Sequence, residues 1–220
     1  MKFDGVYLIE DQQGHAWPAT LNMTPGLDVY GEKLVQKEGE ELRLWNPKRS
    51  KLAAAILNGL KEFPIKRDSR VLYLGAASGT TASHISDIAS DGVVYCVEFS
   101  QRSFRGLLKT SAERGNMVPV LADAREPESY LNLLESCDLI YQDVAQVKQA
   151  QILIDNAGLY LKGGGHIIIA IKARSIDSAR GPRDVIAAEI SRLKNVKILE
   201  VVDLEPYGRD HSLVVGVYGL

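Results

Sequence analysis

The feature that most constrains the fold is an alternation of apolar, strand-like runs with helix-like runs from Ser50 to about residue 190. The run "VLYLG" precedes the helical "TTASHISDIA", "VVYCVEF" precedes "QRSFRGLLKTSAER", and "DLIYQD" precedes "VKQAQILIDNAGLYL". Strand–helix repetition with mostly apolar strands is typical of a parallel sheet whose two faces are both covered by helices. The sequence therefore predicts a doubly wound α/β protein.

The two ends of the chain depart from this alternation. Within residues 1–44, the short segments "GVYLIE", "KLVQ" and "ELRLW" are separated by turn-prone stretches such as "DQQGH" and "TPGLD", which predicts a small antiparallel sheet. Near the C-terminus, "VKILEVVDL" and "SLVVGVYG" are joined only by "EPYGRDH", which predicts a hairpin and one antiparallel strand in the large sheet. We expect a small N-terminal β domain over residues 1–49 and an α/β domain over residues 50–220.

Composition sets the cellular context that we expect. The chain of 220 residues is 45% hydrophobic and 25% charged, and charges interrupt every long apolar run, so neither a signal peptide nor a membrane span is predicted. Its two cysteines, Cys96 and Cys137, fall in separate strand-like runs and are interpreted as buried free thiols. We therefore expect a cytoplasmic protein without membrane association and without a metal site.

A Gly-rich segment, "LYLGAASGTTASHI" at residues 72–85, leaves an apolar strand and opens a helix. Such segments bind nucleotides, because free backbone N–H groups and a helix N-terminus meet there. The dinucleotide pattern requires a second glycine at position 77, where alanine stands, and a phosphate-binding P-loop requires a lysine after Gly79, where Thr80 stands. The expected ligand is a nucleoside derivative without a phosphate chain.

Acidic residues follow the predicted strands where a ligand is expected. Glu98, Asp123 and Asp143 end three strand-like runs in turn. In an open α/β sheet the ligand lies beyond the carboxyl ends of the strands, where carboxylates accept hydrogen bonds from ribose hydroxyls and an adenine amino group. The missing dinucleotide pattern, and an acid where a sulfonium would lie, favour S-adenosylmethionine over NAD.

Six separated segments carry a family resemblance. They are "WNPKRSKLAAAIL", "VLYLGAASGTTASHISDI", "VYCVEFSQRS", "DVAQ", "IKARSID" and "EPYGRDHSLVVGVY". In this order they resemble fibrillarin, the family of S-adenosylmethionine-dependent ribose 2′-O-methyltransferases of box C/D ribonucleoproteins, in its compact archaeal form. The resemblance implies a Rossmann-like class I methyltransferase domain with a seven-stranded, mostly parallel sheet behind a small β domain. It also implies methylation of rRNA and tRNA, and a role in their processing.

The resemblance assigns site residues. It places Gly75, Thr80 and Thr81 at the methionine and ribose part of the cofactor, Glu98 and Phe99 at the ribose and adenine face, Asp123 and Ala124 at the adenine edge, and Asp143, Val144, Ala145 and Gln146 toward the substrate. The family's catalytic tetrad of Lys, Asp, Lys and His corresponds to Lys51, Asp143, Lys172 and His211. No tetrad member is missing, so an active enzyme is expected.

The chemistry of these residue types agrees with that assignment. A ribose 2′-hydroxyl is a poor nucleophile, so methyl transfer needs it aligned with the methyl group and relieved of its proton. Lys172 ends the apolar run "HIIIAIK" at the ligand edge, where the nearby cation Lys51 favours the neutral amine that a base requires. We expect Asp143 to orient the lysine and His211 to position the sugar or the lysine. His84, on the helix after the Gly-rich loop, is interpreted as a packed or surface imidazole.

Basic residues are concentrated in one stretch. Residues 1–44 hold eight acidic and four basic side chains, whereas residues 45–70 hold seven basic and two acidic ones, for a net charge of −2 over the chain. This pattern fits a solvated helix face or an RNA-facing patch, and the RNA contacts that we expect are Lys48, Arg49, Arg174, Arg180 and Arg183. A chain this close to neutral is expected to bind RNA weakly alone. The resemblance supplies the partners: a box C/D guide RNA with its target RNA, a Nop-domain scaffold protein and a kink-turn-binding ribosomal-type protein.

Three functions remain open from the residues. The first is RNA-guided ribose methylation, the second is methylation of a protein side chain or small molecule, and the third is binding of S-adenosylmethionine without turnover. Two lysines at the expected site favour the first, because a hydroxyl acceptor needs help from a base more than an amine or thiol does.

Overall fold

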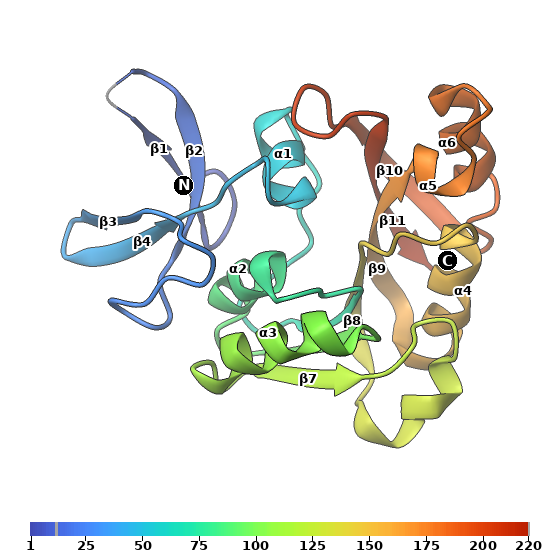
Figure 1. Ribbon diagram of the computed structural model, residues 1–220, viewed down its shortest axis with the longest axis horizontal. Helices are drawn as coiled ribbons and strands as arrows, with labels where there is room; N and C mark the ends of the chain where they lie inside the picture. The colour runs from blue at the N-terminus through green and yellow to red at the C-terminus, as the bar shows by residue number, and fades with distance from the viewer. Residues whose placement is uncertain (12, 220) are drawn as a thin grey trace.

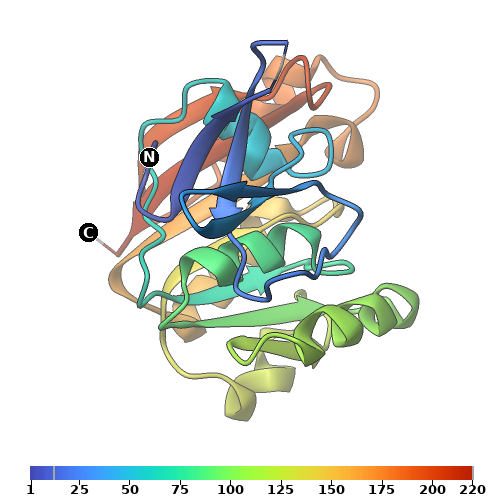
Figure 2. The same ribbon diagram turned by 90° about the vertical axis from the view of Figure 1, so that its left-hand side faces the viewer.

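Two β-sheets form the frame of the computed structural model, which describes residues 1–11 and 13–219 (Figure 1). Gln12, in the first expected turn, lies outside the described residues. The small sheet has the strand order β1-β2-β4-β3 and the large sheet has the order β10-β11-β9-β8-β5-β6-β7. Figure 2 shows the small sheet in front of α1 and α2, which separate it from the large sheet.

The small sheet is antiparallel throughout, as the sequence predicts. Its strands are β1 (Val6–Glu10), β2 (Ala16–Leu21), β3 (Leu34–Lys37) and β4 (Glu40–Leu44). The sequence pattern missed β2, because its proline argues against a strand. In the structure β2 pairs with β1 along its length but with β4 only from Ala19 onward, so Pro18 stands where β2 has one paired neighbour.

The large sheet has the predicted mostly parallel arrangement. Its parallel strands are β5 (Arg70–Leu74), β6 (Val93–Glu98), β7 (Met117–Leu121), β8 (Cys137–Gln142) and β9 (Leu161–Lys172). The hairpin of β10 (Val196–Asp203) and β11 (His211–Tyr218) is also confirmed, with β11 antiparallel to both of its neighbours. From β5, the strands β6 and β7 extend the sheet on one side, whereas β8 and β9 extend it on the other side. Ligands bind at such a reversal of strand order in α/β sheets.

Helices cover both faces of this sheet, as expected. One face packs against α1 (Lys51–Leu57), α2 (Thr80–Ile88) and α3 (Gln101–Ala112), and the other against α4 (Gln149–Tyr160) and α6 (Pro182–Ile190). Alternate residues of β5 serve the two cores: Val71 and Tyr73 lie in the first, Leu72 and Leu74 in the second. The division of the chain at residue 49 stays a prediction.

Two segments differ from the regular pattern. The run "PESYLNLLES" forms a 3₁₀ helix, η1 (Pro127–Leu133), with non-helical backbone angles at Tyr130. The Tyr130 hydroxyl donates to Asn156 and its ring stacks on Tyr160, so packing against α4 fixes this departure. The segment "KARSIDSARGPRD" after β9 contains a short helix, α5 (Ala173–Ile176), and its last three residues belong to α6.

Buried ion pairs join the small sheet to α2. Arg43 of β4 places Nη1 2.8 Å from Asp87 Oδ2, and Arg114, after α3, places Nη1 2.6 Å from Asp87 Oδ1. Trp45 stacks on His84 of α2 with ring centroids 4.7 Å apart. Burial first, and then the charges of Arg43 and Arg114, lower the pKa of His84 well below its usual value. His84 is therefore a packed, neutral imidazole, one of the two roles that the sequence allowed.

Over residues 1–11 and 13–219, no helix combines the length and apolar character that crossing a membrane requires. In the same described part of the chain, no three His, Cys, Asp or Glu side chains are grouped as metal ligands would be.

Candidate active site

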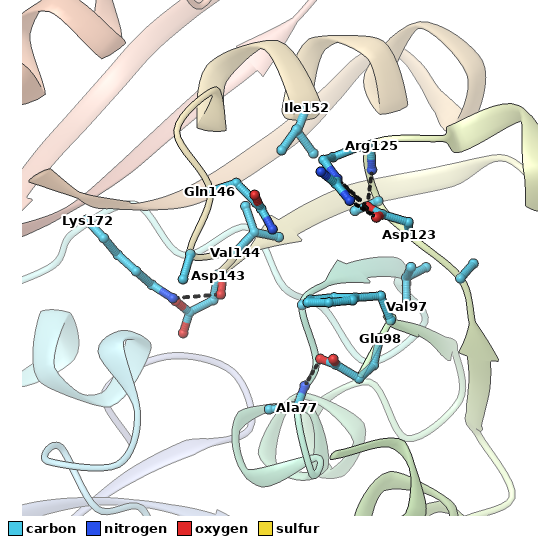
Figure 3. Close-up of a pocket in the computed structure, with 15 residues that line it drawn as sticks. Ala77, Val97, Glu98, Asp123, Arg125, Asp143, Val144, Gln146, Ile152 and Lys172 are labelled. Carbon is cyan, nitrogen blue, oxygen red and sulfur yellow. Dashed lines mark hydrogen bonds and ion pairs between the residues drawn. The ribbon is translucent and has the colours of Figure 1, made fainter. Parts of the chain in front are cut away.

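A cavity of about 220 Å³ opens at the carboxyl ends of β5, β6, β7 and β8, at the point where the strand order reverses (Figure 3). Nine of the eleven cofactor residues expected from the sequence line it. Its wall is formed by Gly75, Ala77, Val97, Glu98, Phe99, Ala122, Asp123, Ala124, Arg125, Asp143, Val144, Ala145, Gln146, Ile152 and Lys172.

The Gly-rich loop lines the cavity with Gly75 and Ala77, and close packing explains why residue 75 is a glycine. Gly75 has a φ of +80°, and a Cβ there would lie 3.1 Å from both the Asp143 carbonyl oxygen and Val144 Cγ1. Any larger residue would push the loop away from the end of β8. Ala77 also has a positive φ, of 50°, and its N–H donates to Glu98 Oε2 over 2.9 Å. The end of β6 therefore holds the loop in place.

Glu98 ends β6 and is almost fully buried at the cavity. Besides the bond from Ala77, its Oε1 accepts from the Ser100 N–H over 2.7 Å. Two backbone donors orient the carboxylate, and each oxygen keeps a further lone pair. Glu98 can therefore accept hydrogen bonds from a diol bound in the cavity.

Asp123, after β7, is paired with a residue that the sequence interpretation missed. Arg125 Nε lies 3.0 Å from each oxygen of Asp123, and its Nη2 lies 2.5 Å from Oδ2. Hydrogen bonding from Arg125 lowers the pKa of Asp123, so this carboxylate is ionised at neutral pH. A ligand amino group at Asp123 would share it with Arg125. The sequence feature that could have indicated this pair is an arginine two residues after the acid that follows the strand.

Three of the four expected catalytic residues form one ionic cluster. Lys51 is the first residue of α1, which Ser50 caps; Asp143 follows β8; Lys172 ends β9. Lys51 Nζ lies 3.0 Å from Asp143 Oδ2. Lys172 Nζ lies 2.7 Å from Asp143 Oδ1 and donates to the Asp143 carbonyl over 2.9 Å, and Figure 3 shows Lys172 directed at Asp143. We call Lys51, Asp143 and Lys172 the cavity triad. It reaches the cavity wall through Asp143 and Lys172.

His211, the fourth expected catalytic residue, is the register partner of Lys172 across β11 and β9. It is half-buried, and burial first, then the charges of Lys51 and Lys172, lower its pKa from the usual value. At neutral pH the imidazole is therefore uncharged, with one nitrogen able to donate and the other able to accept. The structure thus brings all four residues to one end of the sheet.

Two expected cofactor residues do not line the cavity as the structure describes it. Thr80 and Thr81 begin α2, and Thr81 Oγ1 donates to Ser50 Oγ over 3.0 Å. Ser50 caps the helix that starts with Lys51. Thr81 therefore helps to fix the start of that helix, and with it the position of Lys51. The cofactor contacts proposed for both threonines stay predictions.

The expected RNA contacts lie in different environments. Lys48 and Arg49 are exposed just before α1, with the Arg49 guanidinium 5.5 Å from the centre of the Tyr30 ring. Arg180 and Arg183 are also exposed, beyond the end of β9.

Arg174 has structural partners of its own. Its Nε donates to Asp210 Oδ2 over 2.9 Å and its Nη1 donates to the Ser178 carbonyl over 2.9 Å. The Ala173 N–H in turn donates to the Asp210 carbonyl over 3.2 Å. These bonds join the chain after Lys172 to the chain before His211, so Arg174 holds the two strand ends together.

The fold and this site define a class of protein: the class I S-adenosylmethionine-dependent methyltransferases, with a seven-stranded, mostly parallel sheet and a ligand cavity at the Gly-rich loop. The family model "Fibrillarin" matches residues 1–220. The chain belongs to the fibrillarin family.

Its relatives are similar over nearly their full length. A fibrillarin-like rRNA/tRNA 2′-O-methyltransferase from Methanopyrus kandleri is 50% identical over 99% of this chain and 95% of its own. Aeropyrum pernix fibrillarin, solved with natively bound S-adenosyl-L-methionine, is 49% identical with a TM-score of 0.90 over 97% of this chain and 94% of its own. A fibrillarin solved in complex with Nop5p is 42% identical with a TM-score of 0.89 over 98% of each chain.

Proposed function

We propose that this chain transfers the methyl group of S-adenosylmethionine to ribose 2′-hydroxyls of rRNA and tRNA, as the RNA-guided catalytic subunit of a box C/D ribonucleoprotein. The observation that carries the proposal is the cavity triad, which holds two lysines on one carboxylate at the wall of a nucleoside-sized cavity. The name of the Methanopyrus kandleri relative supports the same activity and substrate class.

The cavity suits S-adenosylmethionine in shape and in chemistry. Because Gly75 has no side chain, the Gly-rich loop packs closely against the backbone after β8, and both segments border the space for the ligand. Glu98 offers oxygens to the ribose hydroxyls, while Val97 and Ile152 supply apolar surface for an adenine ring. Asp143 is the acid that would lie near the positive sulfonium. The solved Aeropyrum pernix relative, which holds this cofactor, supports the assignment.

Charge balance in the cavity triad favours proton transfer. Two ammonium groups and one carboxylate leave one positive charge uncompensated. When bound, S-adenosylmethionine supplies an activated methyl group and a further positive charge. In this proposal the Lys172 amine takes the proton of the 2′-hydroxyl, as the oxygen would bond to the methyl carbon and the carbon–sulfur bond of the donor would break.

The other members of the tetrad position these groups. Asp143 fixes both lysine nitrogens through separate oxygens, which keeps Lys172 at the cavity wall. His211 is uncharged at neutral pH and can hydrogen-bond the target ribose without adding another positive charge. Lys51 remains the cation that stabilises negative charge developing on the 2′-oxygen.

RNA delivery needs partners in this proposal. With a net charge of −2, the chain has little affinity for RNA at physiological salt, because non-specific affinity scales with the phosphates neutralised. We place it in the cytoplasm with a guide RNA, a Nop-domain scaffold protein and a kink-turn-binding protein. The complex of a 42% identical fibrillarin with Nop5p supports the scaffold. Lys48 and Arg49 then contact the delivered duplex.

The test reconstitutes the particle from purified components and maps methylation on a target RNA. We expect site-specific methylation that requires the guide RNA and moves when the guide sequence changes. The double variant Lys48→Glu, Arg49→Glu should assemble normally and methylate more slowly. Efficient site-specific methylation by the isolated chain would contradict the guided mechanism. Methyl transfer to protein or small molecules with none to RNA would favour the second function considered above.

A further inference from the structure

We propose that Gln149 is a positioning residue for methyl transfer, whose carboxamide couples the loop after β8 to the catalytic end of β9. This inference rests on the proposed function. It concerns a fully buried residue at the start of α4 that does not line the cavity.

Gln149 contacts both sides of the site with one side chain. Its Oε1 accepts from the Lys172 backbone N–H over 3.1 Å. Its Nε2 donates to the Gln146 carbonyl over 2.9 Å. Gln146 belongs to the cavity wall, and Lys172 belongs to the cavity triad. A single planar amide therefore fixes the distance between the loop that carries Asp143 and the strand that carries Lys172.

The geometry of the sheet explains why Lys172 needs a side-chain acceptor at this position. The last register pair between β8 and β9 joins Gln142 to Ile169, three residues before Lys172. β8 ends at Gln142, and the chain that follows it forms the cavity loop. Gln149 Oε1 takes over as the acceptor for Lys172. The backbone position from which the Lys172 side chain reaches Asp143 thus depends on this amide.

Gln149 is itself held rigidly. The Gln142 amide donates to the Gln149 carbonyl over 2.8 Å, and the next residue, Ala150, donates its N–H to Glu189 over 2.6 Å. Gln142 and Glu189 are both fully buried or nearly so. Both bonds hold the backbone at the start of α4, so the Gln149 side chain extends from a fixed position toward Lys172.

The chemical requirement is specific to a carboxamide. A donor is needed toward Gln146 and an acceptor toward Lys172, and both lie on the one side chain. Gln149→Met keeps the volume and removes both bonds. Gln149→Glu keeps an acceptor for Lys172 and loses the donor toward Gln146. Asn116→Leu is the matched control, because Asn116 is a buried amide bonded to Ser86 and Ala89, away from the cavity.

The experiment measures kcat, KM for S-adenosylmethionine and cofactor affinity for each variant in the reconstituted particle, at a temperature below all unfolding transitions. We expect Gln149→Met to lower kcat by about 10- to 100-fold, the scale of a misplaced catalytic group, with cofactor affinity changed by less than about threefold. Gln149→Glu should retain more activity than Gln149→Met, and Asn116→Leu should stay within about twofold of the parent. If the parent particle methylates no RNA, the proposed function fails, and amide exchange decides the positioning role.

Amide hydrogen exchange at Lys172, measured by NMR on the isolated chain, reports the hydrogen bond to Gln149 Oε1 and does not depend on methylation activity. Exchange should be at least about tenfold faster in Gln149→Met than in the parent and unchanged in Asn116→Leu, because only the first loses the acceptor. The proposal is overturned if Gln149→Met keeps kcat within about twofold of an active parent. It is equally overturned if Lys172 exchange is unaltered.

Discussion

Two clusters in this molecule place one aspartate between two basic side chains, and they differ in nearly every other respect. The junction triad, Arg43, Asp87 and Arg114, lies between the small sheet and α2 and is almost completely shielded from solvent. In the cavity triad, Lys51, Asp143 and Lys172 keep 23%, 15% and 14% of their side chains exposed. The same charge pattern thus occurs once in a buried contact between two parts of the fold and once in a partly exposed cluster beside the cavity.

The two triads also differ in charge balance. Arg43 of the junction triad has a second acidic partner, Glu32, whose Oε1 lies 2.6 Å from Arg43 Nε, so two cations meet two anions. The cavity triad has one anion for two cations. A fully buried cluster is stable only when its charges are balanced, whereas a partly exposed one, such as the cavity triad, can carry an excess charge that the surrounding water or a substrate offsets.

The residue types follow the same division. A guanidinium stays protonated under all ordinary conditions and makes several directed bonds, which suits a permanent joint. An ammonium group is a point charge that can give up its proton, which suits a base. In this molecule two arginines hold the buried junction, and the proposed function assigns the chemistry to the two lysines of the cavity triad.

The largest effect on stability is expected from Asp87→Asn. It leaves Arg43 and Arg114 buried without the carboxylate that pairs them and should lower the free energy of unfolding by about 3–5 kcal/mol. Urea unfolding measures this loss. The matched variant Asp143→Asn should cost only about 1 kcal/mol, because water reaches the cavity triad. Equal losses for the two variants would remove the distinction between joint and site.

A smaller effect, on the affinity for S-adenosylmethionine, is expected when the cavity residue Asp123 is changed. Asp123→Ala should weaken S-adenosylmethionine binding by about 1–3 kcal/mol, because an adenine amino group would lose its acceptor. Calorimetry on the isolated chain measures the affinity. Asp91→Ala removes an arginine-paired aspartate that is not on the cavity wall and should bind like the parent. Unchanged affinity in Asp123→Ala would reject the adenine assignment.

The smallest effect is a pH dependence of stability that arises at the junction. His84 has its pKa lowered when folded, so the unfolded chain takes up this proton first as pH falls. Stability should therefore be fully present above about pH 6.5 and decline below it, by at most about 1.4 kcal/mol per pH unit for this histidine. Unfolding midpoints from pH 7.5 to 5 measure the slope.

Two variants isolate the contribution of His84. His84→Gln should reduce the slope, whereas His15→Gln, at an exposed position, should preserve it. The comparison uses the slope and not the midpoint, since His84→Gln also loses the stacking on Trp45. A slope that is unchanged in His84→Gln would show that His84 does not titrate in this range, because His166 and His211, whose pKa values are also lowered by burial, account only for the slope that remains.

Local pattern was sufficient to predict much of the fold and part of the site. The alternation of apolar strands and helices gave the doubly wound sheet, and a loop too short for a crossover gave the antiparallel β11. The Gly-rich loop and the acids at Glu98, Asp123 and Asp143 lie at one cavity because the carboxyl ends of parallel strands meet at one edge. These features depend on residues that are neighbours in sequence or on a general rule of sheets.

What escaped prediction depends on long-range contacts. The junction triad joins residues 43, 87 and 114, whose charges look like solvated surface until the two sheets are packed. The kink of η1 depends on Tyr130 meeting Asn156 and Tyr160 of a later helix. The strand β2 was hidden by its proline, whose neighbours in the sheet only the structure shows.

In the proposed mechanism the cavity triad acts through the Lys172 amine, which takes the proton of the 2′-hydroxyl. The most direct test is single-turnover methylation of a guided target RNA by particles that contain Lys172→Arg. This variant keeps the positive charge and loses the base, so the rate should fall by at least about 100-fold while affinity for S-adenosylmethionine stays within about threefold. A rate within about threefold of the parent would contradict the account, because a permanent cation at residue 172 would then be sufficient for catalysis.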